Sequence, residues 1–536
     1  MEPLIVDALA SGRGKRLATR DAIGVGPRSV AGVLEGRGLE PRIALAESVL
    51  GGDVSLVGHD LLLVSGMTSD FRAIRRVVSK WRAESGGPVL IGGPIASEPR
   101  RALLKGGADL CVVGEGEPAL GELLGLGLAE GVLPNPEALA DVRGAAYLDR
   151  RDIRVNPLRP VMRREVYEGL TPSTETVVDY PLYRSARVYV EVLRGCSNYQ
   201  RAQIGLTDES CADCGRCRAG SLEERYYCPV GIPPGCGYCS VPSLFGPPKS
   251  RSSDGVAREV GGLLSKGVRR IVLSAPDLLD YGRDLLVEPE PLTDPRHPEP
   301  NYDALEGLLS GLADLDAVAD GDVSIMVENV KASLVTPEAA GLLGRYLAGT
   351  PVNIGFETGS GEHSLGIGRP STPDENLRAL RRLKTAGLKP YVYFIHGLPG
   401  QSVETVEETV ETIGRSVEAG ASRIILYRFQ PLPMSAFHDR PTASPALKDK
   451  LSKRIHDAAR RANLGLKEDM RGCRVRVVVA EPYDRDRRYH VAYPMLHGPV
   501  VLVDGAEGLP GEVVEVEVVG VASDRMVRGR LVGATF

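Results

Sequence analysis

Seven of the chain's nine cysteines fall within one short segment, between residues 194 and 240. They are Cys196, Cys211, Cys214, Cys217, Cys228, Cys236 and Cys239. A thiolate is a nucleophile and a soft metal ligand, and thiols two residues apart suit coordination of zinc or of an iron–sulfur cluster. Seven unligated thiols at this density is the least favoured interpretation, so the segment predicts a metal centre.

The composition indicates a cytoplasmic protein, and in that compartment structural disulfides are rare. The sequence contains no run of about 18 apolar residues, so we expect no transmembrane helix and no membrane partner. The first residues, MEPLIVDALASGRGKR, lack the basic start and apolar core of a secretory signal. The formal net charge of −5 gives no overall basic excess, although a basic face on one domain would be hidden in that sum.

The first 145 residues alternate short apolar runs with helical patterns, which predicts an open α/β sheet. The apolar runs span residues 60–66, 87–94 and 108–120, and each runs into glycines. Ligands of such sheets bind at the carboxyl ends of the strands, where these glycines fall, but glycines there also serve simple tight turns.

A more regular strand–helix alternation occupies residues 187–440. Strand-like runs lie at 187–195, 269–277, 322–330, 351–360, 389–400 and 422–431. Six such units in series predict a partial (β/α)6 barrel, with the chemistry at the carboxyl ends of its strands. Thr336-Pro337 and Thr372-Pro373 each place a capping side chain before a first-turn proline, and the Pro-, Asp- and Glu-rich segment 283–320 suggests a surface insertion.

The pattern changes to period-two strands near the C-terminus, which predicts a small all-β, OB-like barrel with four recognisable strand runs. Cys111 and Cys473 lie in apolar strand patterns and are expected to be core residues. The predicted divisions are an open sheet at 1–145, a linker at 146–186, the barrel core at 187–440 with a Cys-rich insertion at 197–235, a helical connector at 441–470 and the β-barrel at 471–536.

Several motifs in order make residues 187–440 resemble the radical S-adenosylmethionine (SAM) superfamily. The pattern E-x-x-R-G-C ends at Cys196, and C-x-Y-C runs from Cys236 to Cys239. The stretches GFETGSGEHSLGIGRPSTPDEN and FIHGLPGQSVETVEET are similar to that superfamily's E-x-G-S and G-x-P-G-E-T motifs. The resemblance implies an enzyme in which three cysteines bind a [4Fe–4S] cluster, whose open iron is chelated by SAM.

The seven cysteines then divide into three and four. Most relatives space the three ligands as C-x3-C-x2-C, whereas here 39 residues separate Cys196 from Cys236. We assign Cys196, Cys236 and Cys239 to the SAM cluster, because the first strand delivers Cys196 to the barrel mouth; Cys228 in place of Cys196 is the alternative. The remaining Cys211, Cys214, Cys217 and Cys228 resemble a ferredoxin run, so they predict an auxiliary [4Fe–4S] cluster or a zinc site.

The resemblance also implies where SAM would bind. Tyr238 would offer backbone contacts to the adenine, and Asp277 is the carboxylate nearest to the place where many relatives carry Gly-Gly-Glu for the methionyl amine. The other candidates end the later strands and are Glu328, Glu357, Gly359, Ser360, His396 and Gly397. Each of these has a structural interpretation as well, as a turn or core residue.

The flanking domains carry two further resemblances. The N-terminal sheet resembles the cobalamin-binding-type Rossmann domain, but the D-x-H-x-x-G motif whose His ligates cobalt is absent, which leaves cobalamin binding open. The C-terminal barrel resembles the TRAM domain, an RNA-binding module, and its arginines suit phosphate contact. They are Arg471, Arg474, Arg476, Arg525, Arg528 and Arg530.

These features lead to two enzymatic hypotheses. The first is a tRNA-modifying enzyme that methylthiolates or methylates its substrate and takes electrons from a ferredoxin or flavodoxin. The alternative is a cobalamin-dependent radical SAM C-methyltransferase of a small molecule or peptide. A non-enzymatic iron–sulfur scaffold is disfavoured by the intact E-x-G-S and G-x-P-G stretches.

Overall fold

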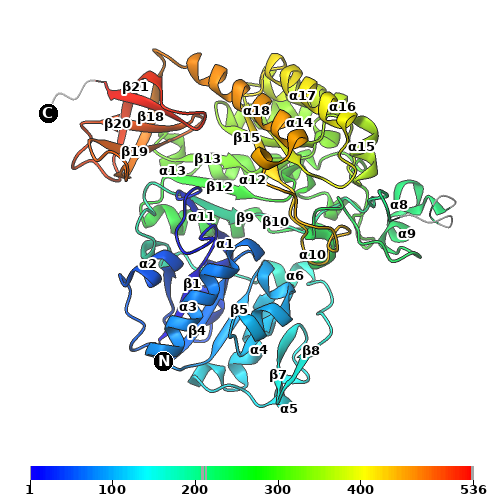
Figure 1. The fold of residues 1–536 in the computed structure, drawn as a ribbon, viewed down its shortest axis with the longest axis vertical. Coiled ribbons are helices and arrows are strands. Elements are labelled where there is room, and N and C mark those ends of the chain that lie inside the picture. The colour runs from blue at the N-terminus through cyan, green and yellow to red at the C-terminus, as the bar shows by residue number, and fades with distance from the viewer. Residues whose placement is uncertain (1, 207–210, 212–213, 533–536) are drawn as a thin grey trace. The chain divides into compact units, whose positions relative to one another are not determined.

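The computed structural model describes residues 2–206, 211 and 214–532, and its chain divides into two compact units. The first comprises Met1–Val190 and Ala257–Val268, and the second comprises Glu191–Val256 and Arg269–Phe536. Figure 1 labels the helices and strands of both. Within the described residues, no helix combines the length and apolar character needed to cross a membrane.

The first unit contains a seven-stranded sheet in the order β3-β1-β4-β5-β6-β7-β8. Its strands are β1 (Pro3–Asp7), β3 (Arg42–Leu45), β4 (Leu61–Ser65), β5 (Val89–Gly92), β6 (Leu110–Val112), β7 (Ala145–Asp149) and β8 (Asp152–Val155). The first five strands in this order pair in parallel, and β7 and β8 extend the sheet antiparallel. The predicted open α/β sheet is therefore confirmed.

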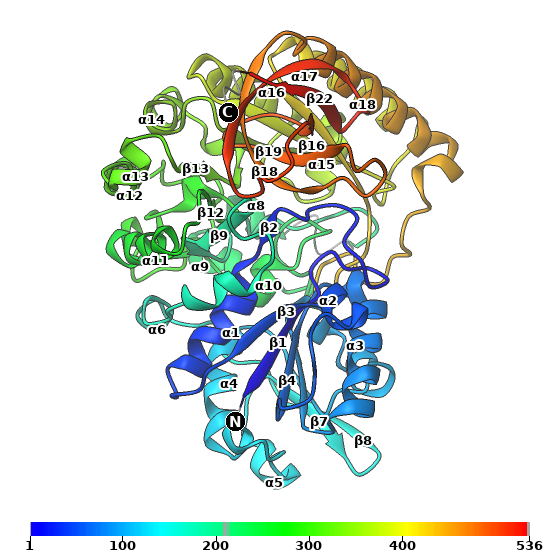
Figure 2. The same cartoon turned by 90° about the vertical axis from the view of Figure 1, so that its left-hand side faces the viewer.

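Helices cover both faces of this sheet. Figure 2 shows α1 (Val25–Glu35) and α4 (Gly116–Gly125) on one face, and α2 (Ala46–Gly51) and α3 (Phe71–Glu84) on the other. The face of α3 that carries Ile74, Val77, Val78 and Trp81 is buried against the sheet with Cys111, because apolar residues at helical spacing form one stripe.

Five of the six predicted parallel strand runs lie in the second unit, whereas most of β9 (Arg187–Glu191), in the run at 187–195, belongs to the first. β12 (Arg270–Ser274) pairs with β13 (Ser324–Val327), and β14 (Asn329–Val330), β15 (Pro351–Glu357), β16 (Lys389–His396) and β17 (Arg423–Arg428) follow in order. Glu328 alone separates β13 from β14; its N–H donates to Leu273 at 3.1 Å, and its carbonyl accepts from Asn353 at 3.1 Å. The parallel arrangement thus continues across Glu328.

The helices of this unit alternate with the strands. They include α10 (Val241–Phe245), α12 (Tyr302–Ala313), α13 (Asp316–Ala319), α14 (Pro337–Leu347), α15 (Gly361–Gly366), α16 (Pro373–Thr385) and α17 (Val403–Glu418), whereas most of α11 (Ser253–Ser265) belongs to the first unit. Thr336 and Thr372 cap α14 and α16 as predicted. The expectation of a surface insertion at 283–320 was wrong, because the segment contains α12, which buries Leu305, Leu308, Leu309 and Leu312.

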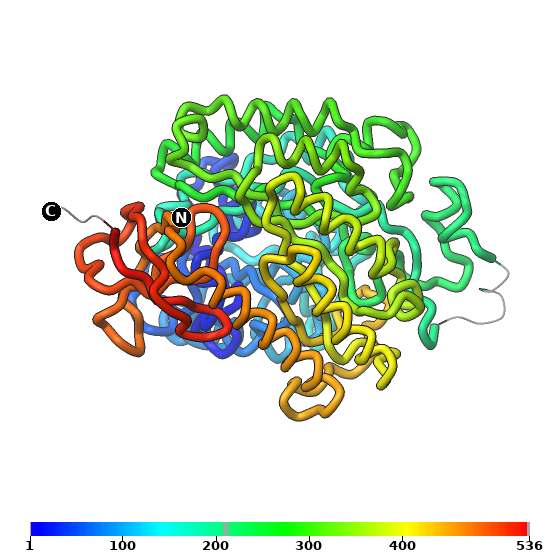
Figure 3. The backbone as a smooth tube through the Cα atoms, turned by 90° about the horizontal axis from the view of Figure 1, so that it is seen from above, coloured from blue at the N-terminus to red at the C-terminus, as the bar shows by residue number. Residues whose placement is uncertain are grey.

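The chain then passes through α18 (Lys450–Glu468) into a closed barrel of order β18-β19-β20-β22-β21. Figure 3 follows this path from yellow (α17) through orange (α18) to red. The strands of the barrel are β18 (Arg474–Pro482), β19 (Tyr489–Pro494), β20 (Val500–Asp504), β21 (Val513–Val521) and β22 (Met526–Leu531). The predicted small barrel is confirmed, and it contains one strand, β19, beyond the four strand runs that the sequence predicted. Cys473 was expected in its core but is exposed, because it lies just before β18 begins.

Candidate active site

A tight turn after β10 (Leu193–Arg194) places Cys196. Gly195 has φ +93°, and a Cβ on it would lie 2.2 Å from the carbonyl oxygen of Pro247, so only glycine fits this close approach. The N–H of Cys196 donates to the carbonyl of Gly246 at 3.1 Å. The R-G-C motif therefore fixes where the first thiol leaves the strand.

The C-x2-C segment is held by close packing around Gly237. A Cβ at Gly237 would lie 2.4 Å from the ring of Phe437. The N–H of Gly237 donates to the carbonyl of Ile367, and the carbonyl of Gly237 accepts from the N–H of Phe437, both at 2.8 Å. Cys239 closes the turn by donating its N–H to the carbonyl of Cys236 at 2.8 Å. The two thiols of this motif are thus held on one short, anchored loop.

Asn198 brings Cys196 and Cys236 together. Its backbone N–H donates to the Cys196 sulfur at 3.5 Å, and its side-chain amide donates to the Cys236 sulfur at 3.3 Å. Burial raises the pKa of Cys239 to about 12, and the neighbouring Cys236 and Cys196 add to that rise. The structure therefore gathers the three cysteines assigned to the SAM cluster.

These thiols have the chemistry of cluster ligands. Burial raises the pKa of Cys196 to about 11, Lys331 opposes the rise, and all nine cysteines are free thiols. A buried thiol keeps its proton at neutral pH until a metal displaces it, and three soft sulfurs match iron better than a hard cation. The donor set thus fits a [4Fe–4S] cluster with one iron left open.

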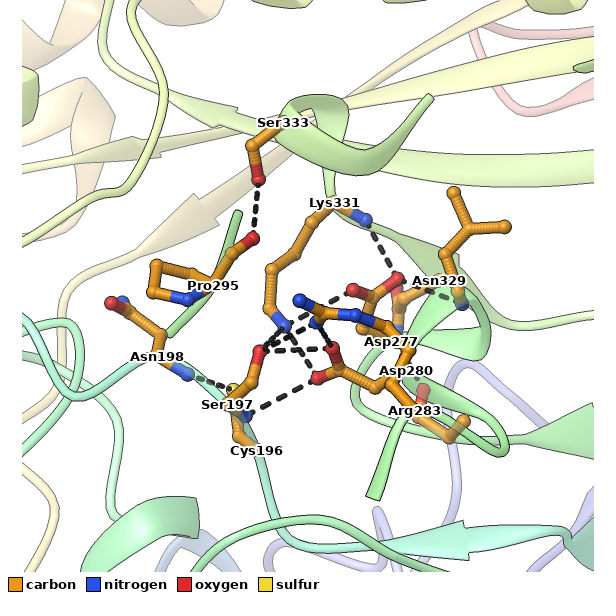
Figure 4. Close-up of polar contacts among 12 residues, drawn as sticks. Cys196, Ser197, Asn198, Asp277, Asp280, Arg283, Pro295, Asn329, Lys331 and Ser333 are labelled. Carbon is orange, nitrogen blue, oxygen red and sulfur yellow. Dashed lines mark hydrogen bonds and ion pairs between the residues drawn. The ribbon is translucent and has the colours of Figure 1, made fainter. Parts of the chain in front are cut away.

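Behind Cys196 lies a buried network of charged side chains (Figure 4). Lys331 Nζ donates to the Ser197 hydroxyl at 2.6 Å and to Asp280 at 2.5 Å, and it lies 3.1 Å from Asp277 Oδ2. Arg283 also pairs with Asp280, and the side chains of both aspartates and of Arg283 are fully buried. The network therefore holds Ser197, the residue that directly follows Cys196.

Asp277, predicted to bind the methionyl amine of SAM, belongs to this network. Its Oδ1 accepts from the backbone N–H of Lys331 at 2.9 Å and from that of Leu279 at 3.1 Å, and its Oδ2 faces the Lys331 ammonium. In this structure Asp277 anchors Lys331, and its contact with SAM stays a prediction.

Tyr238 and Glu357 meet at Arg369, which the sequence analysis did not single out. Arg369 donates to the Tyr238 hydroxyl at 3.3 Å, lies 3.5 Å from Glu357 and reaches the Cys236 sulfur at 3.9 Å. Burial raises the pKa of Glu357, against the opposing effects of Arg369 and of a hydrogen bond with Tyr238. Glu357 also has φ +66°, an uncommon conformation outside glycine that is often found at functional sites.

The other candidates at the strand ends, Glu328, Gly359 and Ser360, differ in what they contact. Glu328 accepts from the Ser274 hydroxyl at 2.7 Å. A Cβ on Gly359 would lie 2.3 Å from the carbonyl of Glu408, which explains this glycine by the packing of α17. Ser360 is buried and stands at the N-terminus of α15.

His396 is buried at the end of β16, and its Nδ1 has no hydrogen-bond partner among the described residues. Burial lowers its pKa, and Arg428 adds to the effect, so the ring is neutral at physiological pH. Gly397 follows with φ +74° and donates its N–H to Gln401 at 2.6 Å.

The insertion cysteines lie in a partly apolar setting. Cys211 and Cys228 both pack against a buried cluster that includes Ile232 and Phe437, and Cys217 lies in α8 (Arg216–Ala219). In the part of the chain that the structure describes, no three His, Cys, Asp or Glu side chains form a group that could hold a single metal ion. The auxiliary cluster or zinc site at these cysteines stays a prediction.

The carboxyl edge of the N-terminal sheet is poor in side chains. β5 ends at Gly92, where an added Cβ would meet nothing within 4 Å, and the exposed Gly93 follows with φ +77°. The loop after β1 keeps the spacing of the D-x-H-x-x-G motif at Asp7 and Gly12, with Leu9 in the place of the histidine. Asp7 is buried and accepts from the Tyr180 hydroxyl at 3.0 Å.

Comparison with known proteins adds a family match and relatives of the whole chain. The model of the Radical SAM superfamily matches residues 226–413. An uncharacterized protein of Methanopyrus kandleri is 45% identical over 530 residues, covering 99% of this chain and 96% of that protein. The tRNA-2-methylthio-N(6)-dimethylallyladenosine synthase of Pelobacter propionicus is 25% identical over 311 residues, 56% of this chain and 63% of that protein.

A solved structure shares the fold over most of the chain. It is the radical S-adenosylmethionine methyltransferase TsrM from Kitasatospora setae with cobalamin and [4Fe–4S] cluster bound, with a TM-score of 0.57 at 16% identity. The similarity covers 82% of this chain and 77% of TsrM. This likeness shows the fold alone. The match to the superfamily's model over residues 226–413 identifies this chain as a radical SAM enzyme.

Proposed function

We propose that this protein is a cobalamin-dependent radical SAM methyltransferase that acts on a small molecule or peptide. The observation that carries the proposal is the likeness to TsrM, a methyltransferase whose structure holds both cobalamin and a [4Fe–4S] cluster, over both units of the chain. This was the alternative among the sequence-based hypotheses, and the comparison supports it better than it supports tRNA methylthiolation.

In this proposal Cys196, Cys236 and Cys239 hold the SAM cluster. When bound, such a cluster supplies the electron that cleaves SAM reductively, and a ferredoxin or flavodoxin would replenish it. The chain's own residues position the ligands: Gly195 sets the turn before Cys196, Gly237 packs the C-x2-C loop under Phe437, and Asn198 joins the two segments. The cluster's open iron would leave room for SAM beside Tyr238 and Glu357.

The N-terminal sheet fits a broad, flat ligand such as cobalamin. Two of its central parallel strands, β4 and β5, end in the small residues Ser65 and Gly92, and ligands of open α/β sheets bind at that edge. With Leu9 where the cobalt-ligating histidine would stand, the bound cobalamin would have no side-chain ligand from this position. The proposal therefore concerns a cobalamin held by shape and backbone contacts.

The test is retention of cobalamin by the full-length protein. After incubation with hydroxocobalamin and desalting, the wild type should keep about one cobalamin per chain, measured by its visible absorption. Gly92→Leu should reduce that retention strongly, because a side chain there enters open space without backbone strain. Gly341→Leu, a matched change on an exposed helix position with similar open space, should leave retention unchanged. No retention by the wild type would reject the proposal.

The C-terminal barrel supports a second candidate, modification of RNA, and tRNA in particular. All six of these barrel arginines are exposed, and three lie opposite carboxylates on a neighbouring strand: Arg474 and Arg530 opposite Glu517, and Arg476 opposite Glu515. An exposed basic set on a small barrel suits phosphate contact. A filter assay with total tRNA at increasing salt distinguishes the candidates, since phosphate binding weakens steeply as salt rises.

A further inference from the structure

Ser197 and Asn198, the two residues that follow Cys196, are each held by several hydrogen bonds. The N–H and hydroxyl of Ser197 donate to the two oxygens of Asp280, at 3.2 and 2.9 Å, and the same hydroxyl accepts from Lys331 (Figure 4). Ser197 is fully buried. Its contacts point away from sulfur, so they fix the backbone of the loop without touching a thiol.

Asn198 differs from Ser197 because its donors reach sulfur. Its side-chain nitrogen donates to the Cys236 sulfur at 3.3 Å and to the carbonyl of Gly368 at 2.9 Å. Its side-chain oxygen accepts from the N–H of Gln200 at 3.2 Å, which sets the orientation of the amide. Asn198 is 2% exposed, so these bonds are shielded from bulk solvent.

We propose that Asn198 is a positioning residue of the SAM cluster that also raises the cluster's reduction potential. The proposal rests on the assignment of Cys196 and Cys236 as cluster ligands. A hydrogen bond to a ligand sulfur stabilises negative charge there, and one-electron reduction adds negative charge to the cluster, so N–H···S donors favour the reduced state. Asn198 donates to sulfur from its backbone and from its side chain, and a substitution can remove only the side-chain donor.

The experiment is a redox titration of the full-length, anaerobically reconstituted protein, followed by the electron paramagnetic resonance signal of the reduced cluster. Asn198→Leu keeps the size of the side chain and removes its donor. We expect the reduction equilibrium to fall about tenfold, a shift of about 59 mV to lower potential. Asn198→Asp, which places a carboxylate against the Cys236 sulfur, should shift it further in the same direction.

Ser197→Ala is the matched control, because it loosens the same loop but removes no donor to sulfur. It should keep the wild-type potential. An Asn198→Leu protein that loads no iron, while Ser197→Ala loads normally, would support the positioning role. A normal iron content with unchanged potential in both Asn198 variants, or an equal shift in Ser197→Ala, would overturn the proposal. Failure of the ligand assignment is distinct, since Cys196→Ala would then retain the cluster and its potential.

Discussion

Replacing Lys331 with methionine should destabilise the protein strongly. Lys331 is the cation shared by Asp277 and Asp280, whose side chains are fully buried. Removing one partner of a buried ion pair typically costs about 3–5 kcal/mol, because the remaining charge stays desolvated. Since Arg283 and Ser197 still contact Asp280 in the variant, we expect a loss near the lower end, about 3 kcal/mol.

The penalty should depend on pH in a defined direction. In the wild type, burial acts to raise the pKa of Asp280, but Lys331 and Arg283 outweigh it and lower that pKa; burial raises the pKa of Asp277. Without Lys331 both carboxyls would have folded-state pKa values above that of an unfolded aspartate, about 3.9. A group of this kind takes up a proton preferentially in the folded state, so its stability contribution is lost as pH rises. The difference from wild type should therefore be smaller near pH 5 than near pH 8.

Urea unfolding of the full-length protein at both pH values, followed by circular dichroism, measures this effect as a shift in midpoint at unchanged slope. Lys453→Met is the control, because Lys453 pairs with Asp457 on the solvent-exposed face of α18 and should matter little. Adding Asp277→Asn to Lys331→Met should recover part of the loss, since Lys331 is the cation that faces Asp277, whereas Asp280 keeps its pair with Arg283. A loss in Lys331→Met no greater than in the control, or a loss independent of pH, would refute the reasoning.

Three further predictions concern the metal centres and the barrel. Alanine in place of Cys196, Cys236 or Cys239 should abolish the formation of 5′-deoxyadenosine from SAM, whereas full activity in Cys196→Ala with none in Cys228→Ala would favour the other assignment. Reconstituted protein should contain about eight irons, and the triple alanine variant of Cys211, Cys214 and Cys217 about half; about four irons with one zinc would instead make the insertion a zinc site. Glutamine at the six barrel arginines should abolish salt-sensitive retention of tRNA on filters, and retention equal to wild type would exclude the barrel as its binding surface.

Local sequence signals predicted most of the fold. Helix α3 has a clear apolar stripe, and α14 and α16 carry Thr-Pro starts whose caps the structure shows. Strand β19 was missed because its end does not alternate: residues 492–495 are all buried, and one of them is a proline. Helix α12 was missed because the proline- and acid-rich composition around it outweighed a leucine stripe that was present.

The site was predictable only where it is local in sequence. Cys236 and Cys239 form one turn, and the strand that ends at Arg194 delivers Cys196, so the resemblance to the superfamily's motifs locates these three, and their role as ligands stays a prediction. The contacts that hold Ser197 come from Asp280 and Lys331, which lie 83 and 134 positions further along the chain. A single sequence carries no signal for such pairs, and Arg369 was missed for the same reason.

The buried charges behind Cys196 can hold its loop in position while having little net electrostatic effect on a cluster bound there. Asp277 and Asp280 carry two negative charges, and Arg283 and Lys331 carry two positive ones, so the buried network has no net formal charge. A neutral set can hold the loop rigidly and still impose only a weak net field on a cluster beside it, because the opposing contributions largely cancel with distance. Direct donors to sulfur do not cancel in this way. The network therefore determines where Cys196 lies, and the short-range N–H···S contacts of Asn198 are left to influence how readily a bound cluster accepts an electron.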